Sequence, residues 1–297
     1  HAAVVHNGII ENYRELRDEL IALGHVFESE TDTEVVVHLI SQKIEEGLDP
    51  QTAVAQSLKR LKGVFALAII FAGREDLLIG ARKGAPLAVG FGEGEMFLGS
   101  DALALAPLTQ KIMYLEEGDY TVLTHDGATV YDANDNKVER PVVLSATSGA
   151  MIGKGGYRHF MLKEIHEQPD SVKRTIMPRI TDDMPDFSAE GFNPDKLKSY
   201  KNIYIVACGT AMHAGMVGKY IIEKIARVSV TVDIASEFRY RDPIIDKNTL
   251  CIYISQSGET ADTIAALKLA KSKGAKTLAI SNVIGSSITR EADYTIY

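Results

Sequence analysis

The sequence predicts two consecutive domains of different fold class, an α+β domain followed by an α/β domain. In the first half, stretches with helical periodicity come first and strand-like runs follow, an order typical of helices layered on an antiparallel sheet. In the second half, near-continuous apolar strands alternate with helices, which predicts a parallel, doubly wound sheet. Between the two halves, residues 145–156 are small and glycine-rich, as interdomain linkers are.

Three helices are predicted at the start of the first domain, residues 1–144. Residues 11–23 place leucines on one face and end at Gly24, a residue suited to the position after a helix. Thr31-Asp32-Thr33-Glu34 has the spacing of a capping box and opens a second helix that extends through Ile44. A third helix is predicted over residues 51–61.

Six strand-like runs follow these helices and predict antiparallel hairpins. Gly92–Glu95 and Asp126-Gly127 are turn sequences between neighbouring runs. The runs cover residues 64–71, 76–82, 87–91, 96–100, 120–123 and 129–131.

The second domain, residues 157–297, begins with a helical stretch and then alternates. Helices are predicted over residues 160–177, over 212–225 and from Thr260 onward. Strands are predicted over residues 203–207, 228–234, 251–254, 277–280 and 294–297.

Composition excludes several functional classes. The chain of 297 residues is 45% hydrophobic and 24% charged, with a net charge of −8, so a general affinity for nucleic acid or for an anionic membrane is not expected. Cys208 and Cys251 lie in apolar strand contexts, which predicts free thiols in a reducing compartment. The histidines are scattered without metal-ligand spacing, and no metal or other cofactor is expected.

The most informative segment is Ser255-Gln256-Ser257-Gly258-Glu259-Thr260, between an apolar strand and a helix. Three hydroxyls, an amide and the N–H groups of a helix start converge there, which predicts a phosphate site without lysine. Cys208-Gly209-Thr210 follows another parallel strand and therefore opens on the same edge. The structural alternative is an ordinary helix cap, since Ser and Thr are common caps. We interpret Cys208 as a packing residue, not as a nucleophile.

A second candidate site lies at His6-Asn7-Gly8, directly after Val4-Val5. The Asn7 amide and the Gly8 N–H could donate two hydrogen bonds to one oxygen, as an oxyanion hole does in acyl transfer. A plain turn is the structural alternative, because Asn-Gly is a common turn pair. For Asp32 the structural alternative is that its carboxylate only stabilises the N-terminus of a helix.

Several segments together resemble the family of glucosamine-6-phosphate synthases, also called glutamine–fructose-6-phosphate aminotransferases (isomerizing). The resemblance covers essentially the whole chain. Two of its segments, Tyr157–Pro169 and Ser255–Thr263, are together specific to this family. The segments are Val4–Asn12, Ser29–Glu34, Leu115–Asp119, Tyr157–Pro169, Ala207–Thr210, Ser236–Arg241 and Ser255–Thr263.

The resemblance implies a truncated glutaminase domain of the N-terminal-nucleophile αββα type, followed by the first sugar isomerase subdomain. Asn7 and Gly8 match the oxyanion-hole pair, and Asp32 matches the acid that holds the α-amino group of glutamine. The residues that match contacts to the phosphate of fructose 6-phosphate are Thr210, Ser255, Gln256, Ser257 and Thr260. The family usually has serine where this chain has Ala211, which would remove one hydrogen bond worth about 1 kcal/mol.

The family reaction implied by the resemblance makes glucosamine 6-phosphate and glutamate from fructose 6-phosphate and glutamine. A cysteine releases ammonia, and a lysine and a glutamate act on the sugar; nothing in this chain matches these three residues. His1 in place of methionine, and a final strand that looks cut, lead us to expect an internal piece of a longer protein. We expect this piece to bind sugar phosphate poorly and to catalyse nothing alone.

The resemblance also implies a homodimer joined through the isomerase domain. We expect a cytoplasmic protein and, from the net charge of −8, no nucleic-acid or membrane partner. Two alternatives remain open. A sugar-phosphate-binding regulatory module would leave residues 1–144 as an appendage, and their glutaminase-like segments disfavour it. A different amidotransferase, such as a relative of asparagine synthetase, is disfavoured by the phosphate loop.

Overall fold

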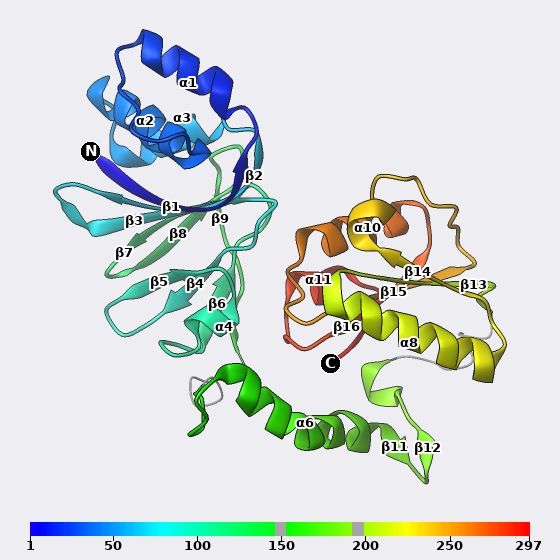
Figure 1. The fold of residues 1–297 in the computed structure, drawn as a ribbon. Helices are drawn as coiled ribbons and strands as arrows, with labels where there is room; N and C mark the ends of the chain where they lie inside the picture. Colours follow the sequence, from blue (N-terminus) through cyan, green and yellow to red (C-terminus); the bar gives the residue numbers. More distant parts are fainter. Residues whose placement is uncertain (146–152, 192–198) are drawn as a thin grey trace. The chain divides into compact units, whose positions relative to one another are not determined.

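The computed structural model describes residues 1–145, 153–191 and 199–297. The described residues divide into two compact units, His1–Gly153 and Lys154–Tyr297 (Figure 1). The central part of the predicted linker, residues 146–152, lies outside the described residues. In the described ranges, no helix combines the length and the apolar character needed to cross a membrane.

The first unit is built on a six-stranded antiparallel sheet of order β1-β2-β3-β7-β8-β9. Its strands are β1 (Ala2–Ile10), β2 (Gly63–Phe71), β3 (Arg74–Lys83), β7 (Tyr120–Thr124), β8 (Gly127–Tyr131) and β9 (Lys137–Val138). Three helices cover one face, α1 (Tyr13–Ala22), α2 (Asp32–Glu45) and α3 (Pro50–Leu58) (Figure 1). Buried aliphatic side chains such as Leu39 on α2 and Leu67 on β2 form the core between these layers.

A second antiparallel sheet of order β10-β6-β4-β5 packs on the other face of the first. Its strands are β10 (Val142–Leu144), β6 (Lys111–Tyr114), β4 (Ala88–Phe91) and β5 (Met96–Gly99). Val89 and Met113 from this sheet meet Leu123 and Val130 from the first sheet in one apolar cluster. The short helix α4 (Ala102–Leu105) packs against the second sheet through Leu105 and Ile112. These helix and sheet layers confirm the α+β class.

The N-terminus of α2 is held differently from the predicted capping box. Thr31 occupies the N-cap position but its side chain makes no capping hydrogen bond. Glu34 instead reaches past Thr31 and accepts hydrogen bonds from the backbone N–H groups of Glu28 and Ser29, both at 2.7 Å. The helix start was correctly predicted, and the capping pair was wrong because the chain before Thr31 folds back over Glu34.

The second unit contains a five-stranded sheet of order β14-β13-β15-β16-β17 in which every pair is parallel. The strands are β13 (Asn202–Ala207), β14 (Val230–Ile234), β15 (Thr249–Ser255), β16 (Lys276–Ser281) and β17 (Tyr294–Ile296). The helices along this sheet are α8 (Gly209–Ala226), α9 (Ala235–Phe238), α10 (Ala261–Ser272) and α11 (Ser287–Glu291).

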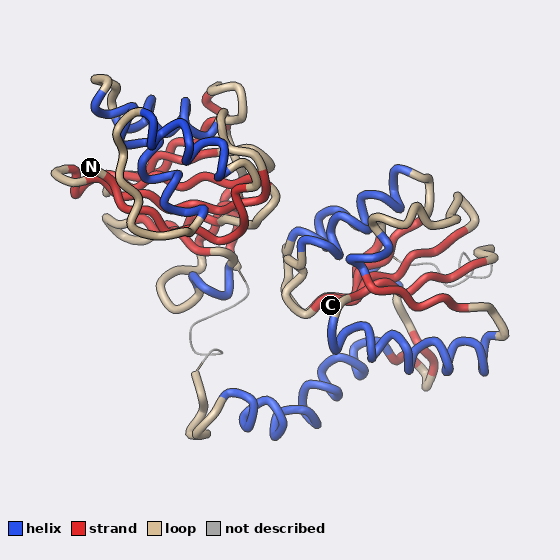
Figure 2. Tube along the Cα trace, turned by 45° about the horizontal axis from the view of Figure 1, so that its top comes forward, coloured by secondary structure: helices blue, strands red, loops and turns tan. Residues whose placement is uncertain are grey.

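Helices cover both faces of this sheet, as Figure 2 shows. Gly215 of α8 lies against Ile205, while Val206 packs with Ala266 and Leu267 of α10. Because successive strand residues point to opposite faces, α8 and α10 lie on opposite sides. The doubly wound parallel sheet is therefore confirmed.

The polypeptide before this sheet forms a long helix and short irregular pieces. Helix α6 (Phe160–Ile176) contains Pro169 and has no buried residue. It is followed by η1 (Met177–Arg179), β11 (Ile180–Thr181), β12 (Met184–Pro185) and η2 (Ser188–Glu190). The predicted helix over residues 160–177 is confirmed.

Candidate functional site

The loops after β13 and β15 start side by side at the carboxyl edge of the parallel sheet. Ala207 pairs with Ile254 in the register of these two adjacent strands, so Cys208 and Ser255 are the next residues along each strand. The Thr263 hydroxyl on α10 contacts the Cys208 sulfur at 3.9 Å. The structure thus brings together the two loops that the sequence singled out.

Hydrogen bonds within the Ser255–Thr260 loop set the directions of its hydroxyl groups. Ser255 Oγ accepts from the Gly258 N–H at 3.0 Å, and Ser257 Oγ accepts from the Glu259 N–H at 3.2 Å. Each serine oxygen accepts from the loop, so its own hydrogen can be donated outward. Ser255 Oγ also lies 3.5 Å from Thr260 Oγ1.

Two helix N-termini face this edge without side-chain caps. Thr260 is the N-cap residue of α10 and Cys208 is that of α8, and neither side chain caps its helix. Thr210 lies in the first turn of α8 and is exposed, as is Gln256 in the neighbouring loop. Backbone N–H groups at such ends favour a negatively charged ligand.

A third loop supports this site, and the sequence analysis missed it. Ser281 ends β16 and Ser286 precedes α11; both are buried, and their hydroxyl oxygens lie 3.4 Å apart. The Ile288 N–H donates to Gly258 O at 3.0 Å, and the Ser287 N–H donates to Glu259 Oε1 at 2.7 Å. The signal was present in the sequence, because serines after a third parallel strand must open on the same edge.

Two candidate residues of the first unit, Asn7 and Gly8, lie on β1, the edge strand of its sheet. Asn7 and Gly8 are exposed and paired with Ala66 and Phe65 of β2, so the alternative of a plain turn was wrong. Gly8 has a φ of 129°, which a strand residue with a side chain rarely adopts. The strand continues beyond the Asn-Gly pair to Ile10.

Asp32 lies next to the end of β1. Its Oδ2 accepts from the Ile10 N–H at 2.7 Å, and its Oδ1 lies 3.9 Å from His6 Nδ1. His6 Nδ1 also lies 3.0 Å from Thr33 Oγ1. Burial lowers the pKa of His6, and the Asp32 charge opposes this shift. Asp32 therefore contacts β1 at Ile10, two residues after the Asn7-Gly8 pair.

The two free thiols differ in exposure. Cys251 is fully buried in β15, and burial raises its pKa to about 12, whereas Cys208 is partly exposed. The thiolate is the reacting form, and burial disfavours it at Cys251. We expect iodoacetamide to modify Cys208 at least tenfold faster, as measured by peptide mass spectrometry. Equal rates in the native protein would contradict this, while equal rates in urea are expected.

Comparisons with known proteins cover both units. Residues 1–107 match the family model described as a glutamine amidotransferase domain, and residues 196–297 match the SIS domain. The chain is 56% identical over 298 residues to the glutamine–fructose-6-phosphate aminotransferase [isomerizing] of Zymomonas mobilis, covering 98% of this chain and 48% of that protein. The protein of the same name from Bradyrhizobium diazoefficiens is 52% identical over 291 residues, with the same coverage.

A solved structure is also similar to part of the chain. It is the C-terminal domain of glucosamine-fructose-6-phosphate aminotransferase from Francisella tularensis, with 44% sequence identity and a TM-score of 0.46. The match covers 48% of this chain and 41% of that one. The chain spans about half the length of the relatives it matches.

Proposed function

Because this chain belongs to the family of glutamine–fructose-6-phosphate aminotransferases (isomerizing), we propose that it provides binding sites for both substrates of that reaction. The enzyme to which these sites belong transfers the amide nitrogen of glutamine to fructose 6-phosphate, with glucosamine 6-phosphate and glutamate as products. The ketose becomes an aldose in the same reaction. This is the first step of hexosamine synthesis.

The observation that carries this proposal is the convergence of polar loops at the carboxyl edge of the parallel sheet. In our proposal, the phosphate of fructose 6-phosphate binds between the uncapped starts of α8 and α10. Thr210, Ser257 and Thr260 donate hydroxyl hydrogen bonds to its oxygens. Ser255 donates from the buried side, and Gln256 donates from the exposed side. The charge of the phosphate is balanced by helix dipoles and N–H groups without a lysine.

In the first unit, we propose that glutamine binds along the outer edge of β1. Asn7 and the Gly8 N–H would stabilise the oxyanion of the glutamine side chain as its amide is attacked. Asp32 would pair with the α-ammonium group, since its carboxylate lies at the same end of β1. The thioester cysteine, the sugar-opening lysine and the proton-transferring glutamate are not assigned to residues of this chain.

The wider organisation is also part of the proposal. Residues 1–144 form the glutamine amidotransferase domain, residues 145–156 the linker, and residues 157–297 the first sugar isomerase subdomain. We propose a cytoplasmic homodimer that associates through the isomerase domain.

The variant Thr260→Val tests the sugar-phosphate site. The Thr260 hydroxyl does not cap α10, so its loss should leave the helix intact. One hydrogen bond to a charged group is worth about 1.5–3 kcal/mol, which predicts roughly tenfold or greater loss of affinity for fructose 6-phosphate. Calorimetric titration of the chain measures this, with inorganic phosphate as competitor.

Thr231→Val is the matched control. Thr231 is exposed on β14 of the same sheet, and valine is a residue that strands favour. The Thr231→Val variant should bind fructose 6-phosphate with the same affinity as the parent. Equal affinities of the Thr260 variant and the parent would refute the proposed phosphate site, as would competition by glucose as strong as that by phosphate.

A further inference from the structure

A glutamate lies inside the loop that we propose to bind phosphate. Glu259 stands between Ser257 and Thr260, two of the residues assigned to that site. A negative charge so close to a phosphate repels it, so this residue type is not expected to help by direct contact. The structure shows a different contact, because Glu259 Oε1 accepts a hydrogen bond from the backbone N–H of Ser287 at 2.7 Å. The side chain therefore connects the loop to α11.

A second hydrogen bond joins the same two segments. The N–H of Ile288 donates to the carbonyl oxygen of Gly258 at 3.0 Å, directly beside the bond from Ser287 to Glu259. Ser287 and Ile288 are the first two residues of α11, so their N–H groups have no acceptor within the helix. The loop supplies both acceptors, one from its backbone and one from the Glu259 side chain.

The start of α11 is itself fixed in the core of the second unit. Ile288 is fully buried and packs in one apolar cluster with Ala266 of α10 and Ala279 of β16. Ser286, which precedes α11, is buried directly against Gly258. Because close-packed neighbours leave these residues little room to shift, α11 is a rigid support for the loop.

The two residues that α11 holds are also those that direct the serine hydroxyls of the loop. The Gly258 N–H donates to Ser255 Oγ at 3.0 Å, and the Glu259 N–H donates to Ser257 Oγ at 3.2 Å. We propose that Glu259 is a positioning residue, whose side chain holds the loop against α11 with the serine hydroxyls in place before the phosphate binds. A loop that is ordered in advance loses less conformational entropy on binding. This inference rests on the proposed phosphate site.

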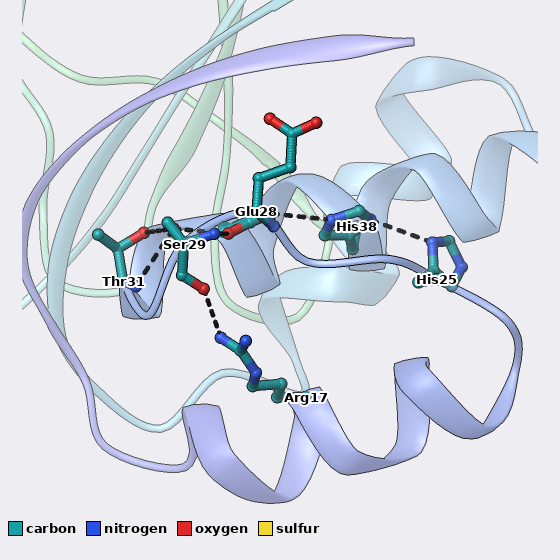
Figure 3. Close-up of polar contacts among 7 residues, drawn as sticks. Arg17, His25, Glu28, Ser29, Thr31 and His38 are labelled. Atoms are coloured by element: carbon teal, nitrogen blue, oxygen red, sulfur yellow. Dashed lines mark hydrogen bonds and ion pairs between the residues drawn. The ribbon is translucent and has the colours of Figure 1, made fainter.

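The first unit holds a loop by the same kind of contact. Glu34 accepts hydrogen bonds from the backbone N–H groups of Glu28 and Ser29, both at 2.7 Å. The hydrogen bond from the Ser29 hydroxyl is the main reason that the pKa of Glu34 falls to about 2. Arg17 of α1 donates to the Ser29 carbonyl oxygen at 2.7 Å from the other side (Figure 3). In both units a glutamate side chain thus accepts backbone N–H groups and joins a loop to a neighbouring segment.

Two variants of Glu259 separate the positioning role from the effect of charge. Calorimetric titration of the chain with fructose 6-phosphate measures both. We expect Glu259→Ala to bind roughly tenfold more weakly than the parent, because the loop loses its acceptor for the Ser287 N–H. Removal of a nearby negative charge alone would strengthen phosphate binding, so the expected change has the opposite sign. Glu259→Gln keeps an acceptor oxygen and should bind at least as tightly as the parent.

The same hydrogen bond can be removed from its other end with Ser287→Pro. Proline has no N–H and suits the first position of a helix, and Ser286 already has the extended backbone that precedes proline, with φ −62° and ψ 161°. This variant should lose about as much affinity as Glu259→Ala. The double variant should be no more than about twofold weaker than either single one, since both remove one contact. Ser287→Ala is the matched control, because it keeps the N–H and should bind like the parent.

Glu291→Ala controls for the loss of a glutamate near α11. Glu291 ends this helix and pairs with Lys268 at 3.5 Å, not with the loop, so the variant should bind like the parent. Parent-like binding by Glu259→Ala would overturn the inference. Losses that simply add in the double variant with Ser287→Pro would overturn it as well.

Hydrogen exchange of the Gly258 amide reports the order of the loop without any ligand. We expect this amide to exchange roughly tenfold faster in Glu259→Ala and in Ser287→Pro than in the parent, and at the parent rate in Glu259→Gln. Unchanged exchange in the first two variants would overturn the inference. If exchange responds as expected but even the parent fails to bind fructose 6-phosphate, then the positioning of the loop stands and the proposed phosphate site fails.

Discussion

The variant Gly258→Ala is expected to abolish detectable binding of fructose 6-phosphate. Gly258 has a φ of 69°, and a Cβ there would lie 2.0 Å from Ser286 Oγ and 2.5 Å from Ser286 Cβ. Ser286 is buried and cannot move away freely. The left-handed backbone costs alanine about 1–2 kcal/mol, and overpacking costs about 1–3 kcal/mol more. The loop should shift, which moves Ser257 and Thr260 away from the phosphate.

Calorimetric titration with fructose 6-phosphate checks this result, with loss of affinity of roughly 100-fold or more expected. Gly285→Ala is the matched control, since Gly285 has a φ of 74° but open space around its Cβ position. The Gly285→Ala variant should carry the backbone strain but lose little affinity for fructose 6-phosphate. The double variant Gly258→Ala with Ser286→Gly removes the two shortest contacts, leaves the one to Ser281 Oγ at 2.9 Å, and should recover part of the affinity. Identical binding by the Gly258 and Gly285 variants would contradict the steric argument.

The sequence was sufficient to predict most elements of both units. Helix α2 and strands β2 and β13 begin or end within two residues of their predicted limits, because long apolar periodicities and glycine signals define them. The parallel sheet was predictable for a further reason. The central strands β13 and β15 contain the continuous apolar runs Ile203–Ala207 and Leu250–Ile254, and helices lie between successive strands of the sheet.

Long-range pairing was not predictable to the same degree. β1 continues through Asn7 and Gly8 because β2 supplies its hydrogen-bonding partners, and no local signal reveals that partner. β6 is as short as β4 and β5, but it pairs with β10 and β4, and no hairpin turn joins it to either strand. The buried serine loop after β16 could have been found from topology.

The variant Gly8→Ala is expected to destabilise the first unit by about 3 kcal/mol. Gly8 has a φ of 129°, and its Cβ would lie 2.1 Å from the Val64 carbonyl oxygen and 2.8 Å from Phe65 Cα. Both are backbone atoms of β2, so no side-chain rotation relieves the contact. Strain of about 1–2 kcal/mol adds to about 1–3 kcal/mol of overpacking. For a unit of this size, Tm should fall by roughly 6–12 °C.

Differential scanning calorimetry measures this effect, and the comparison with Gly24→Ala separates its two causes. Gly24 has a φ of 98° and nothing near its Cβ position, so its variant shows strain alone. If Gly8→Ala loses more stability than Gly24→Ala, the difference is due to the close approach of β1 and β2. That approach fixes the direction of the Gly8 N–H, on which the proposed oxyanion hole depends. Equal losses would mean that β2 can move aside, and a strand that moves so easily could not hold an oxyanion donor in place.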